Sequence, residues 1–163
     1  MEIAFNDIAG VQTLVSDKFG DFGEPITITQ AMIDRFAEIT MDQQWIHVDV
    51  ERAKQESPFG GTIAHGFLTL SMLTALKPGK TAAKLTGFGS VINYGADKLR
   101  FISPVLAGSD IHARKRIAAV RRKGPATQVT FETEVWVVGA ERPALLYRSL
   151  ALFLPEGFKG AGA

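Results

Sequence analysis

The segment from Thr62 to Lys77 constrains the fold of this chain more than any other part of it. Large apolar side chains would lie on every side of a helix formed by it, at Ile63, Phe67, Leu68, Leu70, Met72, Leu73 and Leu76. A helix without a polar face belongs in the interior of a protein. The segment therefore predicts one buried helix of about 24 Å, at ~1.5 Å per residue. Pro78 and Gly79 end it.

The second half of the chain has the alternating pattern of β-strands. We expect strands over residues 91–101, 111–119, 129–137 and 145–154. The segment Arg121-Arg122-Lys123-Gly124-Pro125 is typical of a turn between two of them. Consecutive strands joined by turns predict an antiparallel sheet. The expected fold class is therefore α+β, with a curved antiparallel sheet wrapped around one long central helix.

A helix is also expected ahead of these strands. Thr29 is a suitable N-cap, and the spacing of one helix face follows at Ile33, Phe36, Ala37 and Thr40. Residues 41–49 lose this periodicity, which predicts a loop. A short helical turn over residues 50–55 would end at Ser57-Pro58-Phe59-Gly60-Gly61.

The composition excludes several classes of protein. Hydrophobic residues make up 46% of the 163 residues, which is enough for one core, and the chain is too short for two ordinary domains. A formal charge of +1 gives no basic surface for nucleic acid or for an anionic membrane. Cysteine is absent, so thiolate chemistry is excluded. Because we find no signal-like segment and no apolar run of about 20 residues, we expect a cytoplasmic protein.

Asp42 and His47 are the first candidates for chemistry. On a helix, five residues at ~100° each would point them about 140° apart, whereas a loop can aim both at one point. A carboxylate and an imidazole that share a water molecule form a general acid–base pair. Gln44 could hold the water or a thioester by hydrogen bonding. The spacing alone favours a plainer interpretation, in which Asp42 caps a turn and His47 is a surface residue.

The sequence Ala64-His65-Gly66 at the start of the buried helix is the second candidate site. The first turn of a helix has unpaired N–H groups, which suit a carbonyl oxygen that gains negative charge. Gly66 has no side chain that would keep such a group away from the backbone. Tight packing through Gly66, with His65 as a hydrogen-bonded core residue, explains the same residues equally well. His112 lies in an alternating strand and is expected to be a sheet-face residue.

Together the two segments resemble the MaoC-like family, specifically the (R)-specific enoyl-coenzyme A hydratases. The family pattern of Asp, Asn, His and Asp is matched in spacing by Asp42, Gln44, His47 and Asp49. The downstream His-Gly is matched by His65-Gly66. Gln44 in place of Asn and Trp45 in place of Pro are similar to the nodulation-protein-N-like branch.

The resemblance covers about residues 8–154 and implies a single hot-dog domain over residues 1–163. It also implies a homodimer and the reversible hydration of a trans-2-enoyl thioester of coenzyme A or acyl carrier protein to the (R)-3-hydroxyacyl form. By carry-over, Asp42 and His47 activate the water, and the Gly66 N–H polarises the thioester carbonyl. Ser71 is similar in position to a buried hydroxyl of the family. No metal, flavin or nicotinamide is needed, because adding water involves no net redox change.

Two other functions remain open on the same residues. A thioesterase could use Asp42 and the Gly66 N–H for hydrolysis. A homologue that binds acyl thioesters without catalysis is suggested by the Gln44-Trp45 departure. Lys98, Arg100 or Arg121-Arg122-Lys123 could meet the phosphates of coenzyme A, although the last group is more typical of a solvated hairpin tip.

Overall fold

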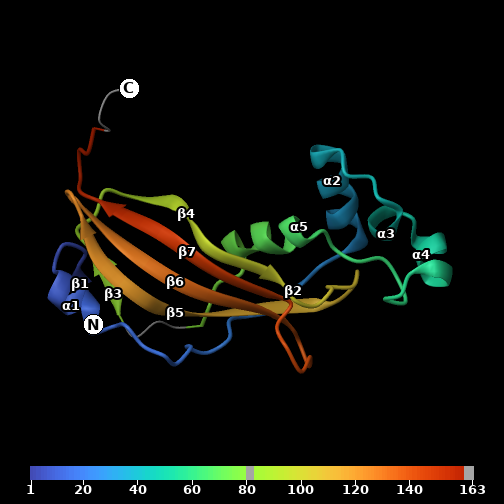
Figure 1. Ribbon diagram of the computed structural model, residues 1–163, viewed down its shortest axis with the longest axis horizontal. Coiled ribbons are helices and arrows are strands. Elements are labelled where there is room, and N and C mark those ends of the chain that lie inside the picture. Colours follow the sequence, from blue (N-terminus) through green and yellow to red (C-terminus); the bar gives the residue numbers. More distant parts are fainter. Residues whose placement is uncertain (80–82, 160–163) are drawn as a thin grey trace.

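The computed structural model describes residues 1–79 and 83–159. Its centre is an antiparallel sheet of five strands in the order β2-β5-β6-β7-β4. The strands are β2 (Ile26–Thr27), β4 (Ser90–Phe101), β5 (Asp110–Lys123), β6 (Ala126–Val137) and β7 (Leu145–Leu154). The sheet curls around helix α5, and three further helices lie at one end of it (Figure 1). This arrangement confirms the expected α+β class and the hot-dog fold.

The strands expected from the alternating pattern are all present, and the last has the expected bounds. In β6, Val129 and Val135 are fully buried on the inner face of the sheet. Glu132 and Glu134 lie between them in the sequence and form ion pairs with arginines of the neighbouring strands. The period of two in the sequence therefore separates an apolar inner face from a charged outer face.

The hairpin between β5 and β6 is tighter than expected. Arg121, Arg122 and Lys123 lie within β5 and pair with residues 126–128 of β6, so they are not part of the turn. Gly124 makes the reversal with a φ of 58°, a left-handed conformation that glycine adopts without a steric penalty. The prediction that the turn includes the three basic residues is wrong, because long charged side chains at an exposed sheet end do not interrupt strand pairing.

The central helix is shorter than predicted. α5 covers Gly66–Ser71, and a 3-10 turn, η1, continues it over Met72–Thr74. Residues 62–65 are extended, because their backbone pairs with another segment: the Ala64 N–H donates to the Val105 carbonyl over 2.7 Å. The predicted span is therefore wrong at both ends. A hydrophobic run cannot by itself distinguish a buried helix from a buried extended segment.

An apolar cluster fixes the start of α5 on the inner face of the sheet. Leu68 of α5 packs there with Ile111, Val135 and Leu145 of the strands. The outer side of α5 stays open, since Phe67 is 62% exposed. The first turn of the helix is thus held in place by the sheet while one side of it remains accessible.

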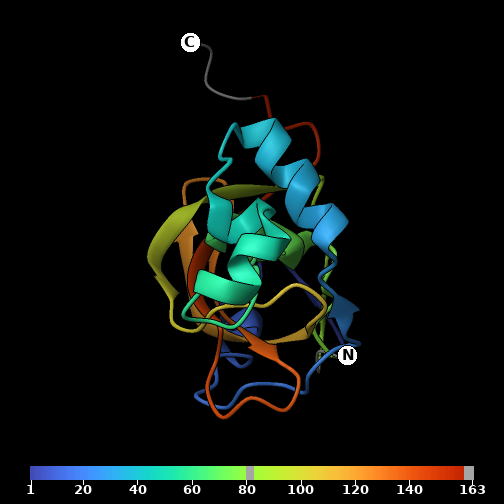
Figure 2. The same cartoon turned by 90° about the vertical axis from the view of Figure 1, so that its right-hand side faces the viewer.

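The helices at the end of the sheet belong to one stretch of chain (Figure 2). α2 covers Gln30–Thr40 and begins, as predicted, at Thr29, whose hydroxyl accepts from the Met32 N–H over 3.3 Å. α3 (Trp45–Val48) replaces part of the predicted loop, and α4 (Val50–Glu56) extends the expected helical turn by one residue. A four-residue helix lies below the length that periodicity can detect, which explains the difference.

A small unit at the opposite end of the sheet has no counterpart in the sequence analysis. It contains α1 (Ile8–Gln12), β1 (Glu2–Ala4) and β3 (Lys84–Thr86), and β1 pairs with β3 in parallel (Figure 1). Phe5 joins this unit to a second apolar cluster under the sheet. Because the candidate residues lie at the helical end, this unit is remote from them.

Candidate active site

The first part of the site is the turn that follows α2. Met41 ends the helix with a φ of 62° and a ψ of 18°, and it is the only non-glycine residue with positive φ in the described part of the chain. The turn brings Asp42 to the entrance of α5, where its backbone carbonyl oxygen lies 3.1 Å from Nε2 of His65. The Asp42 side chain is 55% exposed, so its carboxylate is open to solvent and to a ligand.

His47 is held inside the site by α3. Its side chain is buried, and Nδ1 lies 2.7 Å from the Ile63 carbonyl oxygen. A carbonyl oxygen only accepts, so Nδ1 carries the hydrogen in the neutral ring and Nε2 keeps its lone pair. Burial lowers the pKa of His47 from its usual value; the Ile63 hydrogen bond opposes this effect and the charge of His65 adds to it. At neutral pH His47 is therefore a neutral base with Nε2 free.

The structure brings both predicted catalytic residues together. Asp42, His47 and His65 each place one side-chain oxygen or nitrogen within 4.8 Å of the others. Asp42 also acts on His47 electrostatically and raises its pKa, although less strongly than burial lowers it. One carboxylate and one neutral imidazole at this separation can share a single water molecule, which is the geometry of a general acid–base pair.

His65 is the residue of this group whose part the sequence analysis missed. It lies face to face with His47, with ring centroids 3.8 Å apart and planes inclined by 26°. The expectation of a hydrogen-bonded core histidine is only half right: Nε2 has the Asp42 carbonyl as its partner, but the buried Nδ1 has no hydrogen-bond partner within the described ranges. No signal in the sequence could reveal the stacking, because the segments that carry the two rings meet only in the folded protein.

Gly66 is the first residue of α5, so its N–H has no acceptor within the helix. A Cβ atom at this position would lie 2.9 Å from the ring of Phe101, which is too close for an ordinary contact. Close packing against Phe101 therefore requires glycine here. Tight packing at Gly66 is compatible with a role of its N–H group in binding a carbonyl oxygen, because that N–H has no acceptor within the helix.

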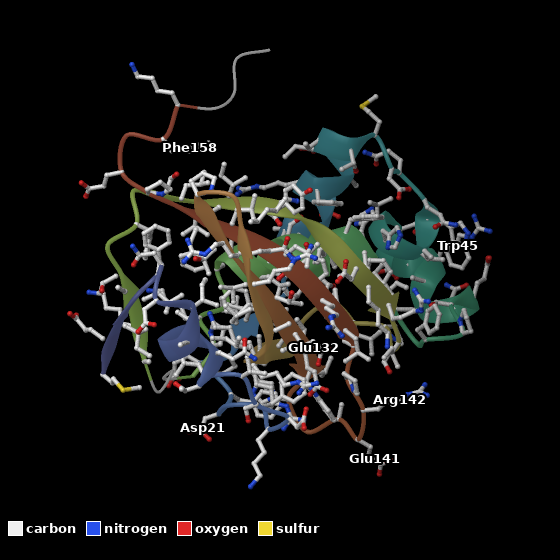
Figure 3. All side chains as sticks on the ribbon, turned by 60° about the vertical axis from the view of Figure 1, so that its left-hand side comes forward. Asp21, Trp45, Glu132, Glu141, Arg142 and Phe158 are labelled. Atoms are coloured by element: carbon white, nitrogen blue, oxygen red, sulfur yellow. The ribbon has the colours of Figure 1, made fainter. Side chains whose placement is uncertain are left out.

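The remaining predicted site residues lie less close to the cluster of Asp42, His47 and His65. Gln44 is exposed at the start of α3, and its side chain makes no capping hydrogen bond. Ser71 is exposed, and its hydroxyl donates to the Phe67 carbonyl of its own helix over 2.7 Å. Trp45 lies at the outer side of the helical end, where the guanidinium of Arg52 sits 4.3 Å from its ring (Figure 3). In the described ranges the backbone carbonyl of Gln44 accepts from the His47 N–H over 2.9 Å, but no hydrogen bond joins the side chain of Gln44 or Ser71 to the side chains of the cluster.

The cluster offers the donor types of a metal site, two imidazoles and a carboxylate. A metal ion must lie close to the plane of each imidazole that binds it, because the nitrogen lone pair lies in that plane. The planes of His47 and His65 are stacked and nearly parallel, so one ion cannot lie in both. The arrangement fits proton transfer better than metal binding.

Comparison with known proteins gives a consistent result. A family model described as "MaoC like domain" matches residues 15–139. The chain belongs to the MaoC-like dehydratase family. It is 41% identical to nodulation protein N of Rhizobium meliloti over 99% of both chains. It is 40% identical to 3-hydroxyacyl-thioester dehydratase Z of Mycobacterium tuberculosis, over 92% of this chain and 97% of that relative.

A solved structure supports the fold of this MaoC-like protein. The monoamine oxidase regulatory protein from Archaeoglobus fulgius superposes with a TM-score of 0.70 at 26% identity, over 95% of this chain and 97% of the other. The resemblance to the nodulation-protein-N-like branch is confirmed by the 41% identity to nodulation protein N of Rhizobium meliloti. The expectation of an enzyme of the hydro-lyase class agrees with the family and with the dehydratase name of a relative. No helix in the described residues is long and apolar enough to cross a membrane.

Proposed function

We propose that this MaoC-like protein adds water reversibly to a trans-2-enoyl thioester and forms the (R)-3-hydroxyacyl thioester. The observation that supports the proposal best is the state of His47. Its Nδ1 is engaged by the Ile63 carbonyl, which leaves Nε2 as the unprotonated nitrogen of a ring that has one nitrogen within 4.8 Å of a carboxylate oxygen of Asp42. A base and a carboxylate that can hold the same water are what such a hydration requires.

The proposed reaction conserves protons. A water molecule held by Asp42 and His47 loses a proton to His47 Nε2 as its oxygen bonds to C3 of the substrate. Electrons of the C2–C3 double bond move toward the thioester oxygen, and the Gly66 N–H stabilises the enolate that forms. C2 then takes up the proton, so both parts of one water molecule reach the same face of the substrate. Dehydration follows the same steps in reverse.

Gln44 and Ser71 have subordinate roles in this proposal. The exposed Gln44 amide is free to bond the thioester or the water once a ligand is present. The Ser71 hydroxyl is already bonded within its helix, so it would act on a substrate as an acceptor or after a rotamer change. The carrier of the acyl group is coenzyme A or acyl carrier protein, since both present the same thioester to the site.

We also propose that the protein works as a homodimer whose contact includes β4. Among the residues that the structure describes, this strand is at the end of the sheet and has a neighbour on one side only. Val91, Ile92 and Tyr94 on it are each close to half exposed. Apolar side chains along an unpaired edge are typical of a strand that meets a partner.

Replacement of the acid–base pair tests the proposed reaction. The Asp42→Asn and His47→Asn variants should hydrate crotonyl-coenzyme A at least about 100-fold more slowly than the wild type, because each lacks one proton-transfer group. The asparagine amide at position 47 can still donate to the Ile63 carbonyl, so the fold is expected to stay intact. Glu38→Gln removes an exposed charge from α2 and serves as a control that should keep full activity.

The same assay separates the alternatives. Hydration consumes the enoyl absorbance without releasing a thiol, whereas a thioesterase would release free coenzyme A, which a thiol reagent detects. A non-catalytic homologue would bind the thioesters and turn over none of them across a series of chain lengths. Normal turnover by a folded Asp42→Asn protein would contradict the proposed mechanism. Chiral analysis of the product tests the (R) configuration.

A further inference from the structure

His65 is buried in contact with two aromatic rings in the proposed site. The residue is 4% exposed, and the ring of Phe36 from α2 lies on one side with its centroid 5.1 Å away. The ring of His47 stacks against it at 3.8 Å. A ring held in this way has little freedom to rotate, so its nitrogen atoms have fixed positions relative to the catalytic pair.

The imidazole of His65 holds the turn that carries Asp42. The Asp42 carbonyl oxygen is 3.1 Å from Nε2, and because a carbonyl only accepts, Nε2 is the protonated nitrogen. One carboxylate oxygen of Asp42 is 3.9 Å from the same atom. Asp42 directly follows the left-handed Met41 and its side chain is 55% exposed, so this hydrogen bond ties the turn to a buried ring.

The other nitrogen of His65 contributes no hydrogen bond to the described part of the fold. Nδ1 is buried and has no hydrogen-bond partner among the residues that the structure describes. A buried polar atom without a partner destabilises the folded protein, and an apolar ring of the same size would avoid that penalty. Packing therefore does not explain why this position is a histidine.

The backbone of His65 also fixes the position of the Gly66 N–H, the third group of the proposed site after Asp42 and His47. His65 is the N-cap residue of α5, and Gly66 directly follows it. The His65 carbonyl oxygen accepts from the Thr69 N–H over 3.1 Å, which closes the first turn of the helix. The position of the Gly66 N–H is thus set by the residue that contacts both Asp42 and His47.

We propose that His65 is a positioning residue, which anchors Asp42 and backs the ring of His47 so that both stay aligned with the Gly66 N–H. The inference rests on the proposed hydratase function. Besides His65, Asp42 is the titratable group that acts on His47. Asp34 of α2 is linked to His47 through the side chain of Gln30, whose amide donates to the His47 carbonyl and to the Asp34 carboxylate.

Two amide variants test the anchoring. The amide nitrogen of glutamine can reach the position of the histidine Nε2, whereas that of asparagine reaches only the position of Nδ1. His65→Gln should keep kcat within about threefold of the wild type. His65→Asn should lower kcat about 10–100-fold with KM changed by less than about twofold, because a small displacement of the catalytic groups is enough for such a loss. Equal activity of the asparagine variant and the wild type would overturn the proposal.

A titration of His47 by NMR gives a readout that does not depend on turnover. The charge of His65 lowers the pKa of His47, so both amide variants should titrate His47 at a higher pH than the wild type does. The acidic limb of kcat/KM should move to higher pH by the same amount. An unchanged titration in both variants would refute this role of His65. A wild-type protein that hydrates no enoyl thioester would refute the proposed function instead, while the titration would still decide the role of His65.

Discussion

His47 is the residue whose surroundings decide when the site can work. It is buried, engaged at Nδ1 and stacked on a second imidazole. Burial is the largest cause of its lowered pKa, because the charged ring loses hydration that the site does not replace. A general base has to be unprotonated at the working pH, and this environment keeps His47 in that form.

This lowered pKa predicts the pH dependence of both activity and stability. The kcat/KM should fall only below the ordinary histidine pKa of about 6.5, since His47 stays neutral until then. The unfolded chain takes up a proton on His47 at a higher pH than the folded protein does. The free energy of unfolding should therefore decrease as the pH falls below about 6.5.

Urea denaturation at pH 7.5 and pH 5 measures the stability effect. The His47→Asn variant is the control, because it keeps a donor for the Ile63 carbonyl and does not titrate. It should lose less stability than the wild type between the two pH values. An equal loss in the two proteins would show that His47 is not the group responsible.

At the scale of single residues, the identity of the candidate catalytic groups could be predicted from the sequence better than their arrangement in space. The spacing of Asp42 and His47, read with the resemblance, indicated the residues that the structure brings together. The sequence did not reveal the contact of His65 with both, since that contact depends on how residues 62–65 pair with the segment before β5. Tertiary pairing of this kind leaves no local pattern.

Among the elements, the turn between α2 and α3 contains a residue with an unfavourable backbone conformation, and its exposed side chain gains little packing energy in return. Met41 adopts the left-handed conformation, in which its Cβ atom crowds the backbone, and its side chain is 82% exposed. Helices commonly end with glycine in this conformation for that reason. A methionine here stiffens the turn that presents Asp42.

Met41→Gly should therefore stabilise the protein and reduce its activity. Removing the crowding should raise the free energy of unfolding by about 0.5–1 kcal/mol, after the greater freedom of glycine in the unfolded chain is taken into account. The more flexible turn should lower kcat, because Asp42 is held less firmly. Chemical denaturation and crotonyl-coenzyme A hydration measure the two effects. Met41→Ala keeps the crowding and is the control; a gain in stability with alanine would contradict the explanation.

The elements differ in how far they could be predicted. α2 has a cap at Thr29 and one apolar face, so local signals fix its start. α5 lacks such signals, and its start at Gly66 depends on where extended pairing stops. β1 and β3 could not be predicted because each has only three residues and they pair across about half of the sequence.

At the scale of the molecule, the five-stranded sheet ends at β4 in a long edge that has no partner within residues 1–79 and 83–159. β4 has twelve residues, and its apolar side chains are exposed over much of its length. An open edge of this kind exposes the protein to aggregation unless something covers it. The proposed homodimer explains how the protein avoids this outcome.

A charge on β4 tests the proposed dimer. Ile92→Lys should convert the dimer into a monomer in sedimentation equilibrium, since a buried ammonium group without a partner destabilises an apolar contact. Ile39→Lys places the same charge on α2, at a side chain that is 82% exposed, and should leave the dimer intact. A monomeric wild-type protein, or a dimer that tolerates the Ile92 variant, would contradict the assignment of β4.

The reactive groups all come from one continuous run of chain, residues 42–66, which is tied to itself by the His47–Ile63 and Asp42–His65 contacts. The four long strands follow later in the sequence. Insertions, deletions and substitutions in these strands therefore leave the order and the spacing of the proposed reacting groups along the chain unchanged.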